Sequence, residues 1–116
     1  MKRAWSARLR RILSSSQENE AEDLAERAVE AGCVAIGEAR VRDRVSVIGT
    51  VTGISADERG WPHVELRDQS GTVTLVWMGA QRLGAITPDA HLIASGRLTL
   101  DGERRVIFNP AYQVIG

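Results

Sequence analysis

The chain has 116 residues, and its hydrophobic fraction of 43% suits one domain with a packed core rather than a disordered protein. Fifteen basic and fifteen acidic residues give a formal net charge of zero, so the chain lacks the basic excess that is typical of strong nucleic-acid binders. A single cysteine, Cys33, excludes an internal disulfide framework and a cysteine-based zinc cluster. No apolar run approaches the roughly 18 residues that span a bilayer, and the basic N-terminus lacks the apolar core of a secretory signal. We therefore expect a cytoplasmic protein with no membrane partner.

Residues 1–38 predict a helical extension whose charges are segregated. Residues 1–11 carry five basic residues and no acid, whereas residues 12–38 carry seven acids and one arginine. Apolar residues recur at helical spacing in both parts, and Gly32 suits the end of the second helix. We expect two short amphipathic helices, neither of them stable alone at this length.

Residues 39–116 predict strands, because apolar and polar residues alternate with a period of two. Five strands are expected: one over 44–54, two in a hairpin over 64–78, one over 91–100, and one over 104–115 that breaks or bends at Asn109 and Pro110. Gly49 and Gly53 predict a bulge or bend in the first strand. In the hairpin turn, Gly71 is expected to adopt a positive φ.

These strands predict a mainly β fold, a five-stranded OB-fold Greek-key barrel that follows the N-terminal helical extension. The alternative is a small barrel of the SH3 type. The long connector over 79–90 and the length of the first strand both disfavour it.

Three segments of the sequence also carry a resemblance to known proteins. Residues 45–51, 68–77 and 106–112 resemble a family of small actinobacterial OB-fold nucleic-acid-binding-domain proteins. More distantly, they are similar to the OB-fold wedge domain of RecG-type helicases. The resemblance covers residues 40–116. It implies the fold and nucleic-acid binding, and it implies no catalytic residue.

Ligands of OB-folds lie across the second and third strands, between the loops that join strands one and two and strands four and five. Single-stranded nucleic acids need aromatic platforms and cations on such a surface. The residues predicted to bind nucleic acid come from this region: Arg59, Trp61, His63, Arg67, Thr72, Thr74, Arg82, Arg104 and Arg105.

Several of these aromatic and basic residues also have structural interpretations. Trp61 is either an exposed platform or a cap on the open end of the barrel, and Arg104 and Arg105 can instead pair with acids across their hairpin. Trp77 and Phe108 are expected in the core, and the hydroxyl of Tyr112 is expected to make a structural hydrogen bond.

Enzymatic activity has little support in the sequence. His63 and His91 are isolated, no glycine-rich phosphate loop opens a helix, and two scattered histidines make a poor metal-ligand set. We expect a non-enzymatic module without metal or cofactor that binds single-stranded or structured DNA or RNA weakly and largely independently of sequence. The alternative is a protein-interaction or self-assembly module, in which the basic segment of residues 1–38 meets the acidic segment of another copy. A positive surface across strands two and three would favour nucleic acid, and a neutral or acidic one would favour protein.

Overall fold

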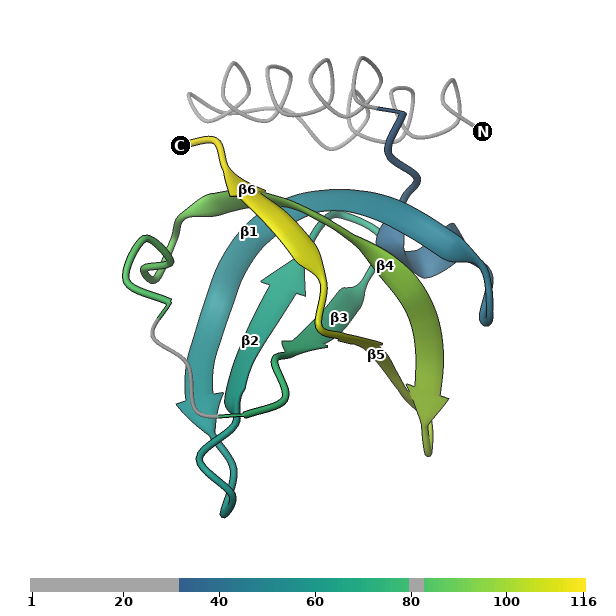
Figure 1. Ribbon diagram of the computed structural model, residues 1–116. Coiled ribbons are helices and arrows are strands. Elements are labelled where there is room, and N and C mark those ends of the chain that lie inside the picture. Colours follow the sequence, from purple (N-terminus) through teal and green to yellow (C-terminus); the bar gives the residue numbers. More distant parts are fainter. Residues whose placement is uncertain (1–31, 80–82) are drawn as a thin grey trace.

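The computed structural model describes residues 32–79 and 83–116, which form a mainly β structure. Its elements in chain order are the 3₁₀ helix η1 (Ile36–Glu38) and the strands β1 (Arg44–Ala56), β2 (Pro62–Arg67), β3 (Thr72–Val76), β4 (His91–Asp101), β5 (Arg104–Phe108) and β6 (Ala111–Val114) (Figure 1). The helices predicted within residues 1–31 lie outside the described residues. In the described part, no helix is long and apolar enough to cross a membrane.

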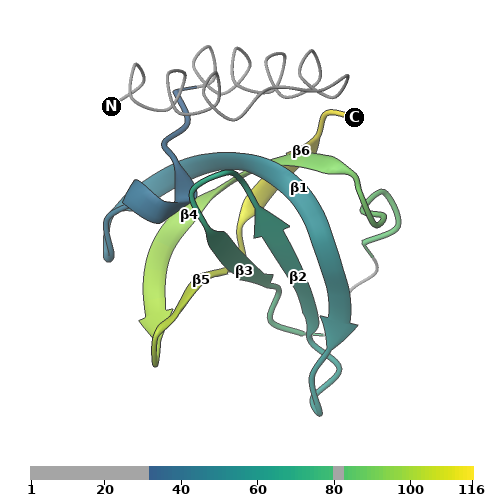
Figure 2. The same ribbon diagram turned by 180° about the vertical axis from the view of Figure 1, so that it is seen from behind.

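Five of the six strands pair in a closed ring, in the order β1–β2–β3–β5–β4 and back to β1. All of these pairs are antiparallel except β3 with β5, which are parallel. β1 arches over the ring, because its residues 44–50 pair with β4 and its residues 50–56 pair with β2 (Figures 1 and 2). The β1–β2 loop and the β4–β5 turn both project from the end of the ring that lies away from the arch of β1.

Gly49 and Gly53 let β1 bend so that it pairs with both β2 and β4. The register with β2 shifts between Val51 and Gly53, which confirms the predicted bulge. At Gly49, an added Cβ would lie 2.6 Å from the carbonyl oxygen of Arg67. The missing side chain therefore lets β1 curve closely against the end of β2.

The core fills the inside of the ring with the inward residues of its strands. It contains the buried residues Val47, Val51, Val64, Leu66, Val73, Leu75, Trp77, Leu92, Ala94, Leu98 and Ile107. Ile36 of η1 and Ala39 pack into the same cluster. The boundary predicted at residue 38 stays a prediction, but the side chain of Ile36 belongs to the core that the strands enclose.

The last predicted strand is two strands in the structure. The chain turns at Asn109, whose φ is 51°, so that β5 pairs with residues 98–101 of β4 and β6 pairs with residues 92–95. The backbone N–H of Asn109 donates to the carbonyl oxygen of Val76, and its Oδ1 accepts a bond from the N–H of Met78. The predicted break is confirmed, while the prediction of a five-stranded domain is corrected to six strands.

The buried side chain of Trp77 packs beneath the turn between β5 and β6, as expected for a core residue. Its ring is 4% exposed, and its Nε1–H donates to the carbonyl oxygen of Pro110 at 3.2 Å. The Tyr112 ring packs edge-on against it, with ring centroids 5.4 Å apart. The contact that the structure gives Tyr112 is thus a ring contact rather than the hydroxyl bond that we predicted. The assignment of Phe108 to the core is wrong, because its side chain is exposed.

The β2–β3 turn is stabilised by a side chain rather than by a glycine with positive φ. Gly71 does not adopt a positive φ, so this expectation is wrong. Instead, Asp68 Oδ1 accepts bonds from the N–H groups of Ser70 and Gly71, and its Oδ2 accepts a bond from the N–H of Ile36 at 2.8 Å. Asp68 thereby holds η1 against the turn. This contact requires a glycine at position 37, where an added Cβ would lie 2.6 Å from the carbonyl oxygen of Ser70.

Cys33 allows a first prediction, because burial raises the pKa of its thiol from the ordinary 9.0 to about 11. The folded pKa exceeds the unfolded one, so the associated stability is fully present below pH 9.0 and is lost as the pH rises toward about 11. We expect slow reaction of the native thiol with a thiol-specific reagent at neutral pH and fast reaction in denaturant. We also expect Cys33→Ala to remove this pH dependence from urea unfolding, whereas equally fast labelling in both states would contradict the burial.

Candidate functional site

Outward-facing residues of three neighbouring strands form one continuous surface. In register, His63 of β2 lies beside Val76 of β3, and Val76 lies beside Phe108 of β5. Paired residues of adjacent strands point to the same side of a sheet. This side of the sheet, which we call the β2–β3–β5 face, comprises His63, Glu65, Arg67, Thr72, Thr74, Val76, Val106 and Phe108. Thr74, Val76 and Val106 are buried, and the other five side chains reach solvent.

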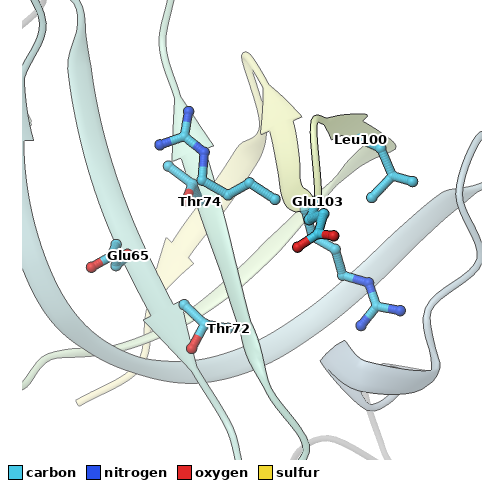
Figure 3. Close-up of a pocket in the computed structure, with 7 residues that line it drawn as sticks. Glu65, Thr72, Thr74, Leu100 and Glu103 are labelled. Atoms are coloured by element: carbon cyan, nitrogen blue, oxygen red, sulfur yellow. The ribbon is translucent and has the colours of Figure 1, made fainter.

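A pocket of about 430 Å³ opens between this face and the β4–β5 hairpin. It is lined by Glu65, Thr72, Thr74, Leu100, Glu103, Arg104 and Arg105. Figure 3 shows Glu65, Thr72 and Thr74 on one side of the pocket and Leu100 and Glu103 on the other. Two carboxylates and two guanidinium groups give the lining a formal charge of zero, so the pocket is not the uniformly positive groove that would have favoured nucleic acid outright.

The two arginines of the pocket are held differently. Arg104 is 52% exposed and donates to Asp101 Oδ2 at 3.3 Å, an exposed pair that contributes little stability. Arg105 is half-buried and donates from Nη1 to the carbonyl oxygen of Ile36 at 3.0 Å. The predicted alternative of pairing across the hairpin therefore holds for Arg104 with Asp101, and Arg105 is tied to η1 instead.

The two acids of the pocket lack such partners. Over residues 32–79 and 83–116, no hydrogen bond or salt bridge ends on the side-chain carboxylate of Glu65 or Glu103. Both residues are exposed, so water solvates their charges. Their oxygens are acceptors that the fold itself does not use.

The loop between β1 and β2 is organised around Asp57. Its Oδ1 accepts bonds from the N–H groups of Arg59 and Trp61, at 2.9 and 3.1 Å. Its Oδ2 accepts from Arg59 Nη2 at 2.8 Å and lies 3.1 Å from Nε2 of His63. The Arg59 guanidinium, together with these further hydrogen bonds, holds the pKa of the Asp57 carboxyl well below its usual range. Asp57 was not predicted as a site residue, yet it contacts three residues that were predicted to bind nucleic acid: Arg59, Trp61 and His63.

Trp61 has one face covered within this loop. The Arg59 guanidinium carbon lies 3.5 Å from the centroid of the Trp61 ring, a cation–π contact, and Trp61 is half-buried. A base that stacks here meets either the free side of the ring or the outer plane of the guanidinium group.

Removing the central carboxylate should loosen the loop. We expect Asp57→Ala to speed amide hydrogen exchange at Arg59 and Trp61, because both N–H groups lose their acceptor. Glu58→Ala, which removes the neighbouring exposed acid, is the matched control and should leave these rates unchanged. Since folding lowers the pKa of the Asp57 carboxyl, this group stays ionised somewhat below its usual range, and only acidification through the lowered pKa should reproduce the loosening. Equal exchange rates in both variants would contradict this role.

The remaining predicted residues are spread along the same surface. Arg67 and Thr72 are exposed where β2 and β3 meet their turn, Thr74 is buried at the floor of the pocket, and Arg82 lies outside the described residues. Three further residues of the face and the pocket were not among those selected from the sequence: Phe108, Glu65 and Glu103. Phe108 follows two buried residues, so its apolar run did not reveal which side of β5 faces outward.

Comparisons with known proteins add the fold family but no relative in sequence. No family model matches the chain, and no curated protein sequence matches it. Many solved structures are similar, and three of them illustrate the likeness. Asparaginyl-tRNA synthetase of Entamoeba histolytica has a TM-score of 0.60 and 22% identity, over 72% of this chain and 23% of that one. Schizosaccharomyces pombe Pot1pC bound to single-stranded DNA has a TM-score of 0.56 and 6% identity, over 72% and 86%. A replication protein A heterotrimer bound to single-stranded DNA has a TM-score of 0.54 and 15% identity, over 70% and 63%.

At these identities the likeness shows the fold alone. The chain has an OB-fold. It matches only about a quarter of the synthetase chain, so nothing of that enzyme's activity transfers. The resemblance to actinobacterial proteins and to the RecG-type wedge domain stays a prediction. Among the described residues, no group of three or more His, Cys, Asp or Glu is placed to hold a metal ion.

Proposed function

We propose that the chain is a non-enzymatic module that binds single-stranded nucleic acid across the β2–β3–β5 face. The observation that carries the proposal is the pocket with Arg104 at the place where OB-folds take their ligands, beside the β4–β5 hairpin. Two of the similar structures are bound to single-stranded DNA. The face adds an exposed ring, Phe108, and the β1–β2 loop adds Arg59 and Trp61.

The binding is expected to be weak. Each stacked base contributes about 1–3 kcal/mol, and among the described residues the aromatic side chains that this surface offers for stacking are Phe108 and Trp61, with His63 beside them. Its cations are few, and two acids lie among them. We expect dissociation constants on the order of 1–100 µM at low salt, with a strong dependence on ionic strength.

Titration of labelled single-stranded DNA and RNA at several salt concentrations tests the proposal. Fluorescence anisotropy should show binding that weakens as salt rises, and Arg104→Ala should weaken it and reduce the salt slope by about one. Arg97→Ala removes an exposed arginine of β4 outside the pocket and should change neither. Absence of binding at high micromolar protein, or binding without salt dependence, would overturn the proposal.

The alternative of protein interaction or self-assembly through residues 1–38 is favoured by the zero formal charge of the pocket lining. Most of that segment lies outside the described residues. Light scattering of the full chain at two protein concentrations, at low and high salt, distinguishes it: association between oppositely charged segments should rise with concentration and fall with salt. A monomer under all conditions would contradict self-assembly.

A further inference from the structure

The pocket contains two acidic residues, Glu65 and Glu103, whose presence is not explained by binding of a phosphate backbone. Glu65 and Glu103 repel phosphates, yet they lie in one pocket with Arg104 and Arg105. A ligand with both negative groups and hydrogen-bond donors would satisfy all four residues. A nucleotide is such a ligand when its phosphate lies against the exposed guanidinium of Arg104 and its base lies between Glu65 on one side of the pocket and Glu103 on the other.

The chemistry of the carboxylates then selects among bases. An ionised carboxylate only accepts hydrogen bonds. Cytosine presents an amino group with two protons at position 4, whereas thymine and uracil present a carbonyl oxygen at position 4 and a donor only at N3. Carboxylates that face position 4 therefore accept from cytosine and are repelled by the carbonyl oxygen of thymine or uracil. Because Glu65 and Glu103 have no partner in the described part of the chain, a base that donates to them displaces water but breaks no protein contact.

We infer that the pocket prefers bases that carry an exocyclic amino group, and in particular cytosine over uracil. The inference rests on the proposed function and adds a base preference to it. It differs from the expectation of binding that is largely independent of sequence, which stays a prediction. Leu100 supplies the apolar wall of the pocket, and Thr72 and Thr74 contribute hydroxyl groups that can donate or accept.

Deoxycytidine and deoxyuridine oligonucleotides of about eight residues provide the test, a length within the usual site size of an OB-fold. The two bases differ only at position 4 and at the protonation of N3, so their size and backbone charge are matched, and the acid variants separate the effect of the carboxylates from the difference in stacking between the bases. Near neutral pH and at low salt, we expect the deoxycytidine oligonucleotide to bind about fivefold more tightly or better. Anisotropy titrations of both against the full chain measure the ratio.

Variants of the two acids assign the preference to the pocket. The double variant Glu65→Gln with Glu103→Gln should bring the ratio close to one, while both oligonucleotides bind more tightly because two negative charges are gone. Asp43→Asn removes an exposed acid outside the pocket and should keep the wild-type ratio. Circular dichroism checks that each variant is folded.

The possible failures are distinct from one another. Equal binding of both oligonucleotides by the wild-type chain would overturn the base preference and leave the proposed function standing. A preference that persists in the double variant would also overturn the inference, because the selection would then lie outside the pocket. Binding of neither oligonucleotide would overturn the proposed function and the base preference together.

Discussion

Trp77→Ala is expected to lower the free energy of unfolding by about 3–5 kcal/mol, the usual cost of removing a large buried aromatic side chain. The ring lies in the core, its Nε1–H is bonded to Pro110, and it packs against Tyr112. The substitution therefore leaves a cavity and an unpaired carbonyl group at the corner between β5 and β6. Urea unfolding followed by circular dichroism measures the effect.

Two further variants separate the causes of this loss. Trp77→Phe keeps a ring but removes the hydrogen bond to Pro110, and we expect a smaller loss of about 1–3 kcal/mol. Trp61→Ala removes a half-buried loop residue and should cost less than Trp77→Ala. A loss at position 77 no larger than that at position 61 would contradict the assignment of Trp77 to the corner of the core.

Gly37→Ala should destabilise the protein by about 1–3 kcal/mol, a typical cost of forcing an extra group into a packed site. An added Cβ would lie 2.6 Å from the carbonyl oxygen of Ser70, which is backbone and cannot rotate away. At Gly71, across the same contact, an added Cβ would lie 3.7 Å from its nearest neighbour, in ordinary contact. Gly71→Ala is therefore the matched control and should change stability by less than about 0.5 kcal/mol.

The substitution at Gly37 should also change the position of Arg105 in the pocket. Moving η1 away from the turn would shift the carbonyl group of Ile36, which accepts the bond from Arg105. Equal stability of the two alanine variants, measured by urea unfolding, would show that the contact between η1 and the turn is looser than the structure has it.

Several strands could be predicted from the sequence because their apolar and polar residues alternate, as in β2 and β4. Inward residues such as Val64 and Leu66 alternate with exposed Glu65 and Arg67, and one face of β2 is buried. The bulge beside Gly53 and the break at Asn109 were also predictable, since glycine and an Asn–Pro pair restrict or free the backbone in known ways.

The need for a glycine at position 37 could not be predicted from the sequence. Gly71 lies in a turn and was expected to need a positive φ, but Asp68 stabilises the turn through side-chain bonds instead. Gly37 is required because two segments far apart in the sequence approach each other closely there. Such a contact has no local sequence pattern.

The sequence predicted which residues lie near one another better than it predicted their contacts, and their role in binding stays a prediction. Most of the residues selected from the sequence lie on the β2–β3–β5 face or in the two loops beside it. The sequence did not reveal that Asp57 gathers Arg59, Trp61 and His63, because these contacts depend on the folded shape of the loop. Phe108 was misplaced since Val106, Ile107 and Phe108 are all apolar and fit either phase of a strand.

One measurement tests the central claim most directly: a map of amide chemical-shift changes when a short single-stranded oligonucleotide is added to the labelled full chain at low salt. We expect the changes to concentrate on the β2–β3–β5 face, on the β4–β5 hairpin around Arg104 and on the loop around Trp61. Residues of β1 that pair with β4 should remain unchanged. Changes centred on β6 or on residues 1–31, or no changes at high micromolar protein, would contradict it.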